Sequence, residues 1–344
     1  MAIINPNPQR EARILSVGAY RPARVVPNSE LVERIDSSDE WIQQRTGIST
    51  RHWAGPEESL TDMAVHAART AIERAGLVPE QIDTIIFATI TYPFQTPSAS
   101  TDLGARLGIE RAAAFDVNAA CAGFSYSVGL ANDMVRSGTS TYALVIGAEK
   151  ISDFLDLDDR ATSFIFADGA GAVVVGPSDH VGIGPTIMGS DVTNREAIAM
   201  EPSWLDYKPG ANLAATAWPV IHQEGQKVFR WAVYEVSKVG NEIIAKSGLT
   251  PADIAAFIPH QANERIIDSL AKSMELPDSV IIARDIRTTG NTSAASIPLA
   301  MDRLLQEHPE LHGKNALLLG FGAGLVFSGQ VVELPPAPQA ITTK

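Results

Sequence analysis

The spacing of apolar residues along the chain predicts helices that alternate with short buried strands. Apolar positions three or four residues apart, the spacing of a helix, lead up to Gly76, and a mostly apolar run follows at 84–89. Glycine is the usual left-handed residue at a helix end, and Pro79 keeps the helix from resuming. A run without polar alternation is typical of a strand buried on both faces. This stretch therefore predicts a helix, a sharp stop and a buried strand.

The same pattern returns half a chain length later. The two copies share a glycine, a leucine, a proline and an isoleucine at the same spacing, in Gly76, Leu77, Pro79, Ile82 and again in Gly248, Leu249, Pro251, Ile254. A second apolar run, at 255–258, follows the second copy as 84–89 follows the first. These coincidences indicate an internal duplication.

A strand, a helix and a strand then follow in the same order in each half. We expect them at 115–117, 122–136 and 142–146, and again at 280–283, 293–306 and 315–319. The chain is therefore predicted to be an α/β protein of two similar halves packed about a pseudo-twofold axis. The halves are expected at residues 1–180 and 181–344, with the seam in the Gly-, Pro- and Ser-rich stretch 176–186 and a flexible tail at 335–344.

Composition narrows the class of protein. Of the 344 residues, 45% are hydrophobic and 19% are charged, which is enough apolar material for a sizeable core. The net charge of −13 makes duplex nucleic acid or an anionic membrane a poor partner. The single cysteine excludes an intrachain disulfide and a multi-cysteine zinc site, and no other metal-ligand spacing is visible. With no signal peptide and no apolar run near the roughly 20 residues that span a bilayer, we expect a soluble cytoplasmic protein.

The lone cysteine, Cys121, lies between a predicted strand and a predicted helix. A thiol at a helix N-terminus faces the positive end of the helix dipole, which favours the thiolate. The small residues on both sides, from Ala119 to Gly123, allow a tight elbow whose N–H groups could hold an oxyanion. A buried free cysteine that only fills space is the competing interpretation, and the local context does not separate the two.

Three further features follow predicted strands and could join Cys121 in one cavity. His260 ends an apolar strand, Asn291 lies at a strand-to-helix elbow, and Phe321 begins a glycine-rich turn. Each has a plain structural alternative, as a packed histidine, a helix cap and a simple turn. Together, a thiol, a neutral imidazole, a carboxamide and backbone amides suit acyl transfer followed by stabilisation of a carbanion. A carbanion formed by loss of CO2 needs no acidic base.

At these residues the chain resembles the β-ketoacyl-[acyl-carrier-protein] synthase III family of the thiolase-fold condensing enzymes, and most closely its actinobacterial members. The resemblance covers about residues 12–334. The motifs that carry it are Asp39-Glu-Trp-Ile-Gln-Gln-Arg-Thr-Gly-Ile, Ala119-Ala-Cys-Ala-Gly-Phe, Asp168-Gly-Ala-Gly-Ala, His260-Gln-Ala-Asn, Gly290-Asn-Thr-Ser-Ala-Ala-Ser and Phe321-Gly-Ala-Gly. It implies a five-layer αβαβα fold, usually as a homodimer.

The resemblance also implies an activity that needs no cofactor, because a coenzyme A thioester is itself the substrate. Cys121 would take the acyl group of an acyl-CoA primer, and malonyl-[acyl-carrier-protein] would then bind and lose CO2. His260 and Asn291 would stabilise the enolate that attacks the acyl thioester to give a 3-oxoacyl-[acyl-carrier-protein]. The amides of Cys121 and Ala323 would form the oxyanion hole, and Phe321 would shape the acyl pocket.

Substrate contacts are implied in the same way. The coenzyme A side would include Trp41, Arg45, Arg160 and Asn263, and a basic patch for the acidic carrier protein would include Lys227, Arg230, Arg265 and Lys272. Such a patch must act against the net charge of −13, so its effect should be local and sensitive to salt. Thr96 stands where some members have a bulky phenylalanine that reaches the partner's acyl pocket, which predicts that branched or longer primers fit.

Several alternatives remain open from the sequence. A polyketide-starter or acyl-CoA-condensing ketosynthase would carry the same three residues, Cys121, His260 and Asn291. A thiolase usually needs a second cysteine, and an elongating ketosynthase uses two histidines, so both fit less well. A cysteine hydrolase would share the chain order Cys, His, Asn. A coenzyme A-binding scaffold without catalysis would form no acyl-enzyme.

Overall fold

Two five-stranded mixed sheets form the frame of the protein. The structure, a computed structural model, describes residues 10–207 and 217–337. The first sheet has the order β1-β7-β6-β4-β5, in which β4, β5 and β6 are parallel and β7 and β1 run antiparallel at one edge. Its strands are β1 (Glu11–Tyr20), β4 (Thr84–Ala88), β5 (Ala113–Val117), β6 (Ala143–Lys150) and β7 (Asp168–Ser178).

The second sheet repeats this topology. Its order is β12-β11-β13-β14-β8, with β11, β12 and β13 parallel and β14 and β8 antiparallel. Its strands are β8 (Ile187–Ser190), β11 (Ala256–Pro259), β12 (Ile281–Ile282), β13 (Asn315–Gly322) and β14 (Val326–Glu333). Because strand order and strand direction agree between the sheets, the predicted duplication is confirmed.

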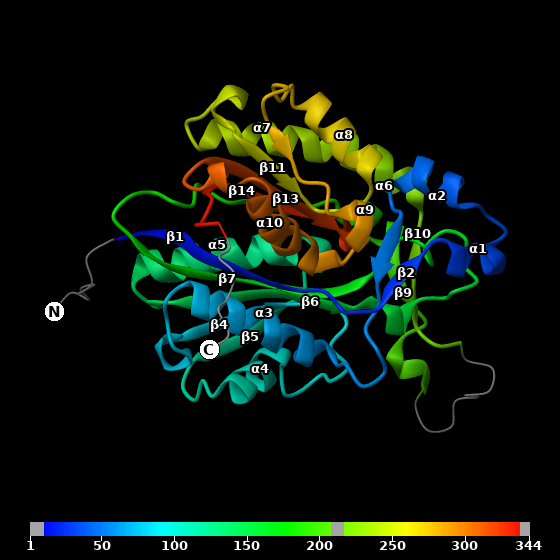
Figure 1. Cartoon of the computed structure of the whole chain (residues 1–344), viewed down its shortest axis with the longest axis horizontal. Coiled ribbons are helices and arrows are strands. Elements are labelled where there is room, and N and C mark those ends of the chain that lie inside the picture. The colour runs from blue at the N-terminus through cyan, green and yellow to red at the C-terminus, as the bar shows by residue number, and fades with distance from the viewer. Residues whose placement is uncertain (1–9, 208–216, 338–344) are drawn as a thin grey trace.

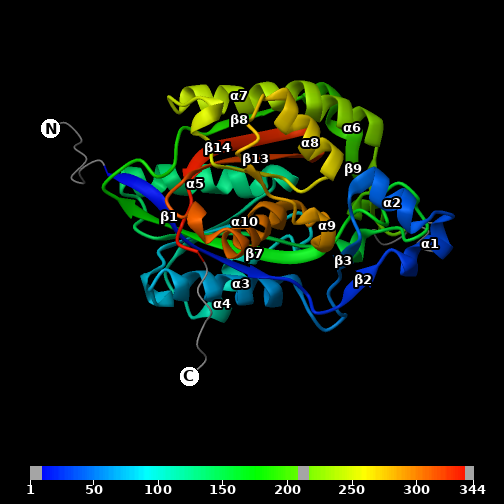
Figure 2. The same cartoon turned by 45° about the horizontal axis from the view of Figure 1, so that its top comes forward.

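Helices fill three layers around the two sheets, as Figures 1 and 2 show. The outer face of the first sheet is covered by α3 (Leu60–Arg74) and α4 (Ala99–Leu107). Between the sheets lie α5 (Gly123–Ser137) and α10 (Ser296–Glu307). The outer face of the second sheet is covered by α6 (Gly225–Trp231), α7 (Ser237–Lys246) and α8 (Glu264–Ser273). The fold is therefore the expected five-layer αβαβα arrangement.

The buried side chains explain why the layers stay together. The central cluster joins α5 and α10 to both sheets through residues such as Phe124 and Ile297, each with no exposed surface. Separate clusters lie under the outer helices, around Phe87 on one side and Phe257 on the other. Each fully buried apolar side chain contributes roughly 1.5–3 kcal/mol. The central helices are thus held from both sides, and the residues at their first turns are fixed in place.

Smaller elements gather at one end of the layers (Figures 1 and 2). They are β2 (Val25–Pro27), α1 (Ser29–Ile35), α2 (Asp39–Thr46), β3 (Thr50–His52), β9 (Ile198–Glu201), β10 (Val220–Gln223) and α9 (Ile286–Thr289). Several of them supply residues to the cavity described below.

The local signals of the repeat are also present in the structure. Gly76 and Gly248 have φ values of +69° and +72°, the left-handed conformation expected after a helix. Each is followed by one 3-10 turn that starts at the proline, Pro79–Gln81 in one half and Pro251–Asp253 in the other. The division of the halves at residue 180 stays a prediction. Of the predicted tail, 335–337 have no helix or strand, and 338–344 lie outside the described residues. Within the described ranges, no helix has both the length and the apolar character to cross a membrane.

Candidate active site

Two tight elbows, one from each half, meet where the central helices begin. Cys121 lies in the 3-10 turn Ala120–Ala122 between β5 and α5, and the matching turn, Ser293–Ala295, precedes α10. The two turns pack against each other. Ala120 and Ser293 both have positive φ, +44° and +47°, a conformation that costs about 1 kcal/mol or more outside glycine and is typical of active sites.

Small residues allow this close packing. A Cβ on Gly123 would lie 2.9 Å from Cβ of Ala88, and a Cβ on Gly320 would lie 2.9 Å from Cα of Ala122. A Cβ on Gly322 would lie 2.7 Å from Cβ of Cys121 and 2.9 Å from its sulfur. The glycines at the end of β13 therefore leave the space in which the thiol lies.

Burial controls the ionisation of Cys121, whose side chain is 8% exposed. Loss of hydration raises the pKa of the Cys121 thiol to about 12, although a hydrogen bond with Ser293 and the amides of Cys121 and Ala323 act in the opposite direction. The helix N-terminus favours the thiolate, but loss of hydration has the larger effect, so the thiol is protonated at rest. The two amides lie beside the sulfur, where an acyl carbonyl oxygen attached to it would be.

His260 directly follows β11 and is also buried. Its Nδ1 lies 2.7 Å from Oγ of Ser296, which also accepts the N–H of Gln261 at 3.3 Å. We assign the Ser296 hydroxyl as the donor to Nδ1, which leaves the ring proton on Nε2. Burial lowers the pKa of His260 to about 3, so the ring is neutral. Phe321 packs edge-on against it, with ring centroids 5.3 Å apart.

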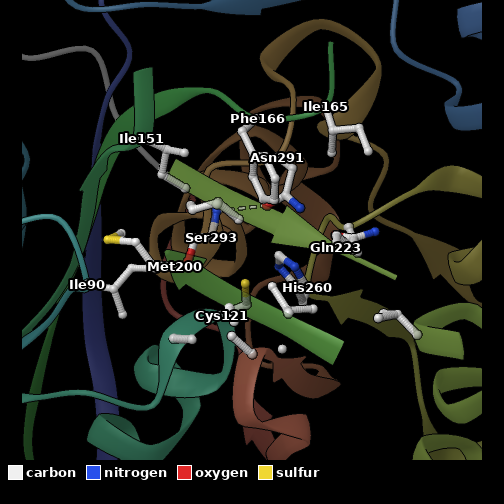
Figure 3. Close-up of a pocket in the computed structure, with 18 of the residues that line it drawn as sticks. Ile90, Cys121, Ile151, Ile165, Phe166, Met200, Gln223, His260, Asn291 and Ser293 are labelled. Atoms are coloured by element: carbon white, nitrogen blue, oxygen red, sulfur yellow. Dashed lines mark hydrogen bonds between the residues drawn. The ribbon is translucent and has the colours of Figure 1, made fainter. Parts of the chain in front are cut away.

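Asn291 is oriented by its own turn. Its Oδ1 accepts the N–H of Ser293 at 2.9 Å, and its main chain bridges to Phe166. An N–H can only donate, so the carboxamide oxygen faces Ser293 and the NH2 group points away from it. Figure 3 shows Asn291, Ser293, His260 and Cys121 around one space. The structure thus brings all three predicted residues together, from both halves of the chain.

These side chains open into one large cavity of about 1300 Å³. Figure 3 shows Ile90, Ile151, Phe166 and Met200 around the space that holds Cys121, and Ile198 and Ile221 also line the cavity. Other walls carry the predicted residues Trp41, Arg45, Arg160, Arg230, Asn263 and Arg265, together with Phe321 and Ala323. The cavity therefore combines a buried thiol, apolar walls and walls that carry basic residues.

Two arginine side chains lie over the ring of Trp41. The guanidinium carbons of Arg160 and Arg45 lie 5.1 Å and 5.6 Å from the ring centre. Asn263 caps α8: its Oδ1 accepts the N–H of Arg265, and its Nδ2 donates to the carbonyl of Arg45. Asn263 therefore also ties α2 to α8, which is a structural role that the sequence reasoning did not include.

Three predicted residues lie outside the cavity walls. Lys227 is 3.6 Å from Glu224, one turn earlier in the chain, and Lys272 lies in the last turn of α8. Thr96 is exposed on the loop before α4 and does not line this chain's own cavity, although its neighbour Gln95 does. Among the residues that the structure describes, no cluster of His, Cys, Asp and Glu could hold a metal ion.

Sequence reasoning missed three polar residues behind the site. Ser293 and Ser296 belong to the quoted motif Gly290-Asn-Thr-Ser-Ala-Ala-Ser, but they were given no role of their own. Glu149 lies near the end of β6, has no exposed surface and binds Ser293. A charged residue next to an apolar strand was the only signal that could have indicated it.

Comparison with known proteins agrees with the site. Residues 115–192 match the family model "3-Oxoacyl-[acyl-carrier-protein (ACP)] synthase III", and residues 244–334 match its C-terminal model. The first match holds Cys121, and the second holds His260, Asn291 and Phe321.

Whole-chain relatives extend this result. A "Beta-ketoacyl-[acyl-carrier-protein] synthase III" of Streptomyces glaucescens is 54% identical, over 94% of this chain and 96% of that protein. The priming β-ketosynthase of the R1128 polyketide pathway superposes with a TM-score of 0.93 at 45% identity, over 96% of this chain and 98% of the other. For the 3-oxoacyl-[acyl-carrier-protein] synthase III of Aquifex aeolicus, the TM-score is 0.85 at 36% identity, over 94% and 99%. The chain therefore belongs to the β-ketoacyl-[acyl-carrier-protein] synthase III family of thiolase-fold condensing enzymes.

Proposed function

We propose that the chain condenses an acyl-CoA primer with malonyl-[acyl-carrier-protein] to give a 3-oxoacyl-[acyl-carrier-protein], and so initiates fatty acid synthesis. The observation that carries this proposal is the meeting of Cys121, His260 and Asn291 in one cavity, with the amides of Cys121 and Ala323 beside the sulfur. The absence of any second cysteine leaves Cys121 as the one thiol able to carry the acyl group.

In the first half-reaction, the sulfur of Cys121 attacks the thioester carbonyl of the primer and the bond to the coenzyme A sulfur breaks. The carbonyl oxygen becomes negative in the tetrahedral intermediate, and the amides of Cys121 and Ala323 are placed to donate to it. One such donor typically contributes ~10²–10³ in rate. The product is an acyl-Cys121 thioester and free coenzyme A.

In the second half-reaction, the malonyl group loses CO2 and leaves an enolate. The neutral His260 donates its Nε2 proton to the enolate oxygen as a hydrogen bond, and the NH2 of Asn291 supplies a second donor. The enolate carbon attacks the acyl-Cys121 carbonyl, and the Cys121 sulfur leaves. Both donors are uncharged, so they favour the enolate without protonating it outright.

Substrate binding follows from the walls of the cavity. Trp41 would stack on the coenzyme A adenine, with Arg160 on the other side. Two stacking contacts of about 3.5 Å need roughly 7 Å, which is more than the 5.1 Å between Arg160 and Trp41. Arg160 must therefore move outward when the adenine binds. Arg230 and Arg265, which line the cavity, would attract the acidic carrier protein, with Lys227 and Lys272 farther out.

The primer is proposed to be branched or longer than acetyl. The apolar walls near Cys121 leave room for it, and Thr96 is small where a phenylalanine would fill space. Thr96 is exposed in this chain, which is consistent with a position that reaches the cavity of a second copy in a homodimer. We place this reaction in the cytoplasm, since a lone reduced thiol suits a reducing compartment.

The test is condensation with malonyl-[acyl-carrier-protein] across a panel of acyl-CoA primers, with products identified by chain length and branching. We expect 3-oxoacyl-[acyl-carrier-protein] from branched or medium-length primers, and Thr96→Phe should narrow the range. Activity with acetyl-CoA alone would refute the primer proposal. Equal activity with malonyl-CoA and with malonyl-[acyl-carrier-protein] would favour an acyl-CoA-condensing ketosynthase. Products that are used only to build a polyketide would favour a polyketide-starter ketosynthase. Free fatty acid released without CO2 would indicate a hydrolase.

A further inference from the structure

Cys121 must lose its thiol proton when it is acylated, so a nearby group has to accept that proton. The thiol is protonated at rest, because burial raises its pKa. His260 is a weak base, since burial lowers the pKa of its conjugate acid to about 3. With Nδ1 assigned as the acceptor from Ser296, its Nε2 already carries a proton. Another acceptor is therefore needed as the sulfur attacks the primer.

A buried carboxylate lies behind the thiol at the end of a hydrogen-bond chain. The side chain of Ser293 is close enough to the Cys121 sulfur to lower the pKa of the thiol, and its hydroxyl donates to Oε1 of Glu149 at 3.1 Å. Figure 3 shows the Ser293 side chain on the same side of the cavity as the Cys121 sulfur. The serine keeps its place although its φ of +47° disfavours any residue other than glycine. A strained position that retains a hydroxyl is what a functional serine would show.

Glu149 has no counter-charge to neutralise it. Its carboxylate accepts hydrogen bonds from Thr89 at 3.1 Å, from the N–H of Ile90 at 3.1 Å and from Thr91 at 2.6 Å, besides Ser293. All of these are uncharged, and no cation is hydrogen-bonded to it within residues 10–207 and 217–337. The carboxylate is thus held as an acceptor, and a proton on it would be shielded from solvent.

The charged groups nearby are engaged elsewhere. On β7, Gly169 stands opposite Glu149 in the strand register, and the carboxylate of Asp168 binds Ser152 and the N–H of Ala54. Lys150 donates its Nζ to the carbonyl of Gly55 and lies 3.7 Å from Asp153. β4 and the Ser293 turn bring only hydroxyls, amides and apolar groups. On the cavity side, Cys121 and His260 are joined by Asp116, whose carboxylate accepts the N–H groups of Ala99 and Ser100. The other charged residues of the cavity walls are Arg45, Arg160, Arg230 and Arg265.

We propose that Glu149 accepts the Cys121 proton through the hydroxyl of Ser293. The thiol proton passes to Oγ of Ser293 while the serine's own proton passes to Oε1 of Glu149. The sulfur forms its bond to the acyl carbon as the carbon–sulfur bond to coenzyme A breaks, and the coenzyme A thiolate takes a proton from water. In the second half-reaction, the Cys121 sulfur leaves the tetrahedral intermediate and recovers its proton from Glu149 along the same path.

This inference rests on the proposed role of Cys121 as the acyl acceptor. It is tested by whether one substitution, at Glu149, speeds or slows acylation. Glu149→Gln keeps the shape of the side chain but cannot accept a proton. If Glu149 were only a nearby negative charge, which raises the pKa of Cys121, its removal would ease ionisation and speed acylation. If it is the proton acceptor, its removal slows acylation by about 10²-fold or more.

The experiment measures the rate of acyl-enzyme formation by rapid quench and mass spectrometry, from pH 5 to pH 10, with alkylation by iodoacetamide in parallel. In the unaltered enzyme the rate should rise with pH and level off above about 7, because burial raises the pKa of Glu149 to about 7 and the ionised form is the acceptor. Glu149→Gln should lose that plateau and keep rising with pH. Ser293→Ala keeps the charge of Glu149 but removes the hydroxyl between Glu149 and Cys121. It should therefore slow both acylation and alkylation.

The matched control is Asp168→Asn, which removes another buried carboxylate from the same sheet without contact with Ser293. It should keep the pH profile of the unaltered enzyme, and circular dichroism should show every variant folded. Acylation by Glu149→Gln at or above the unaltered rate, with the plateau retained, would overturn the relay while leaving the acyl-enzyme intact. No acylation in the unaltered enzyme would instead overturn the proposed function.

Discussion

Gly322→Ala is a steric test of the site, because the added methyl group would enter the space that Cys121 occupies. Its backbone is extended, so alanine is allowed there, and Gly322→Ala acts through its new methyl group alone. That methyl would lie 2.7 Å from Cβ, 2.9 Å from the sulfur and 3.0 Å from the N–H nitrogen of Cys121. These separations are shorter than carbon contacts of about 3.5 Å, so Cys121 or the neighbouring Ala323 amide must move.

The added methyl group should lower both the stability of the protein and the rate of acylation. Overpacking of this kind lowers the free energy of unfolding by typically about 1–3 kcal/mol. Displacement of one oxyanion donor or of the nucleophile lowers the rate by about 10²–10³. We expect acyl-Cys121 formation in Gly322→Ala to slow by about 10²-fold or more while the protein stays folded at 25 °C.

The assay is the time course of acyl-enzyme formation by mass spectrometry, with thermal unfolding followed in parallel. Gly55→Ala is the control, since a Cβ there meets no atom within 4 Å and the residue has no positive φ. It should keep both the rate and the melting temperature. Acylation by Gly322→Ala within twofold of the unaltered rate would refute the argument that this glycine seats the thiol.

Four further outcomes are expected. His260→Ala and Asn291→Ala should slow condensation more than acylation, and equal loss in both half-reactions would contradict their assignment to the enolate. Trp41→Ala should raise KM for acyl-CoA with little change in kcat; an unchanged KM would place the adenine elsewhere. Glu149→Gln should raise the melting temperature more at pH 8 than at pH 5. Burial raises the pKa of Glu149 from 4.5 to about 7, so unaltered stability falls as pH rises between those values, and an equal shift at both pH values would contradict this. The pH profile of the condensation rate should show no inflection near pH 6.5 from His260, because its pKa is lowered to about 3. Titration of the His260 ring near pH 6.5, followed by NMR, would contradict this.

The sequence alone predicted the helices and buried strands whose apolar residues recur at a regular local spacing. Helix α5, expected at 122–136, begins at Gly123 and ends at Ser137, and the helix expected at 293–306 is preceded by one 3-10 turn and runs from Ser296 to Glu307. The duplication was visible because both copies need the same glycine stop and proline turn. The antiparallel part of each sheet, β1 and β7 in the first and β8 and β14 in the second, was not predicted, since the pairing joins segments far apart in the chain.

Long-range contacts also explain what was missed at the site. The raised pKa of Cys121 could not be predicted from the elbow, because burial is a property of the assembled halves. Glu149 approaches Ser293 only because β6 and the turn before α10 pack closely: a Cβ on Gly147 would lie 2.2 Å from the carbonyl oxygen of Ala294. Such proximity leaves no trace in local spacing.

The central claim is that Cys121 carries the acyl group, and intact-mass analysis with peptide mapping after mixing with an acyl-CoA tests it most directly. The account predicts one acyl adduct per chain, located on Cys121 and absent from Cys121→Ala, and discharged when malonyl-[acyl-carrier-protein] is added. An adduct on another residue, or 3-oxoacyl product from Cys121→Ala at the unaltered rate, would contradict it.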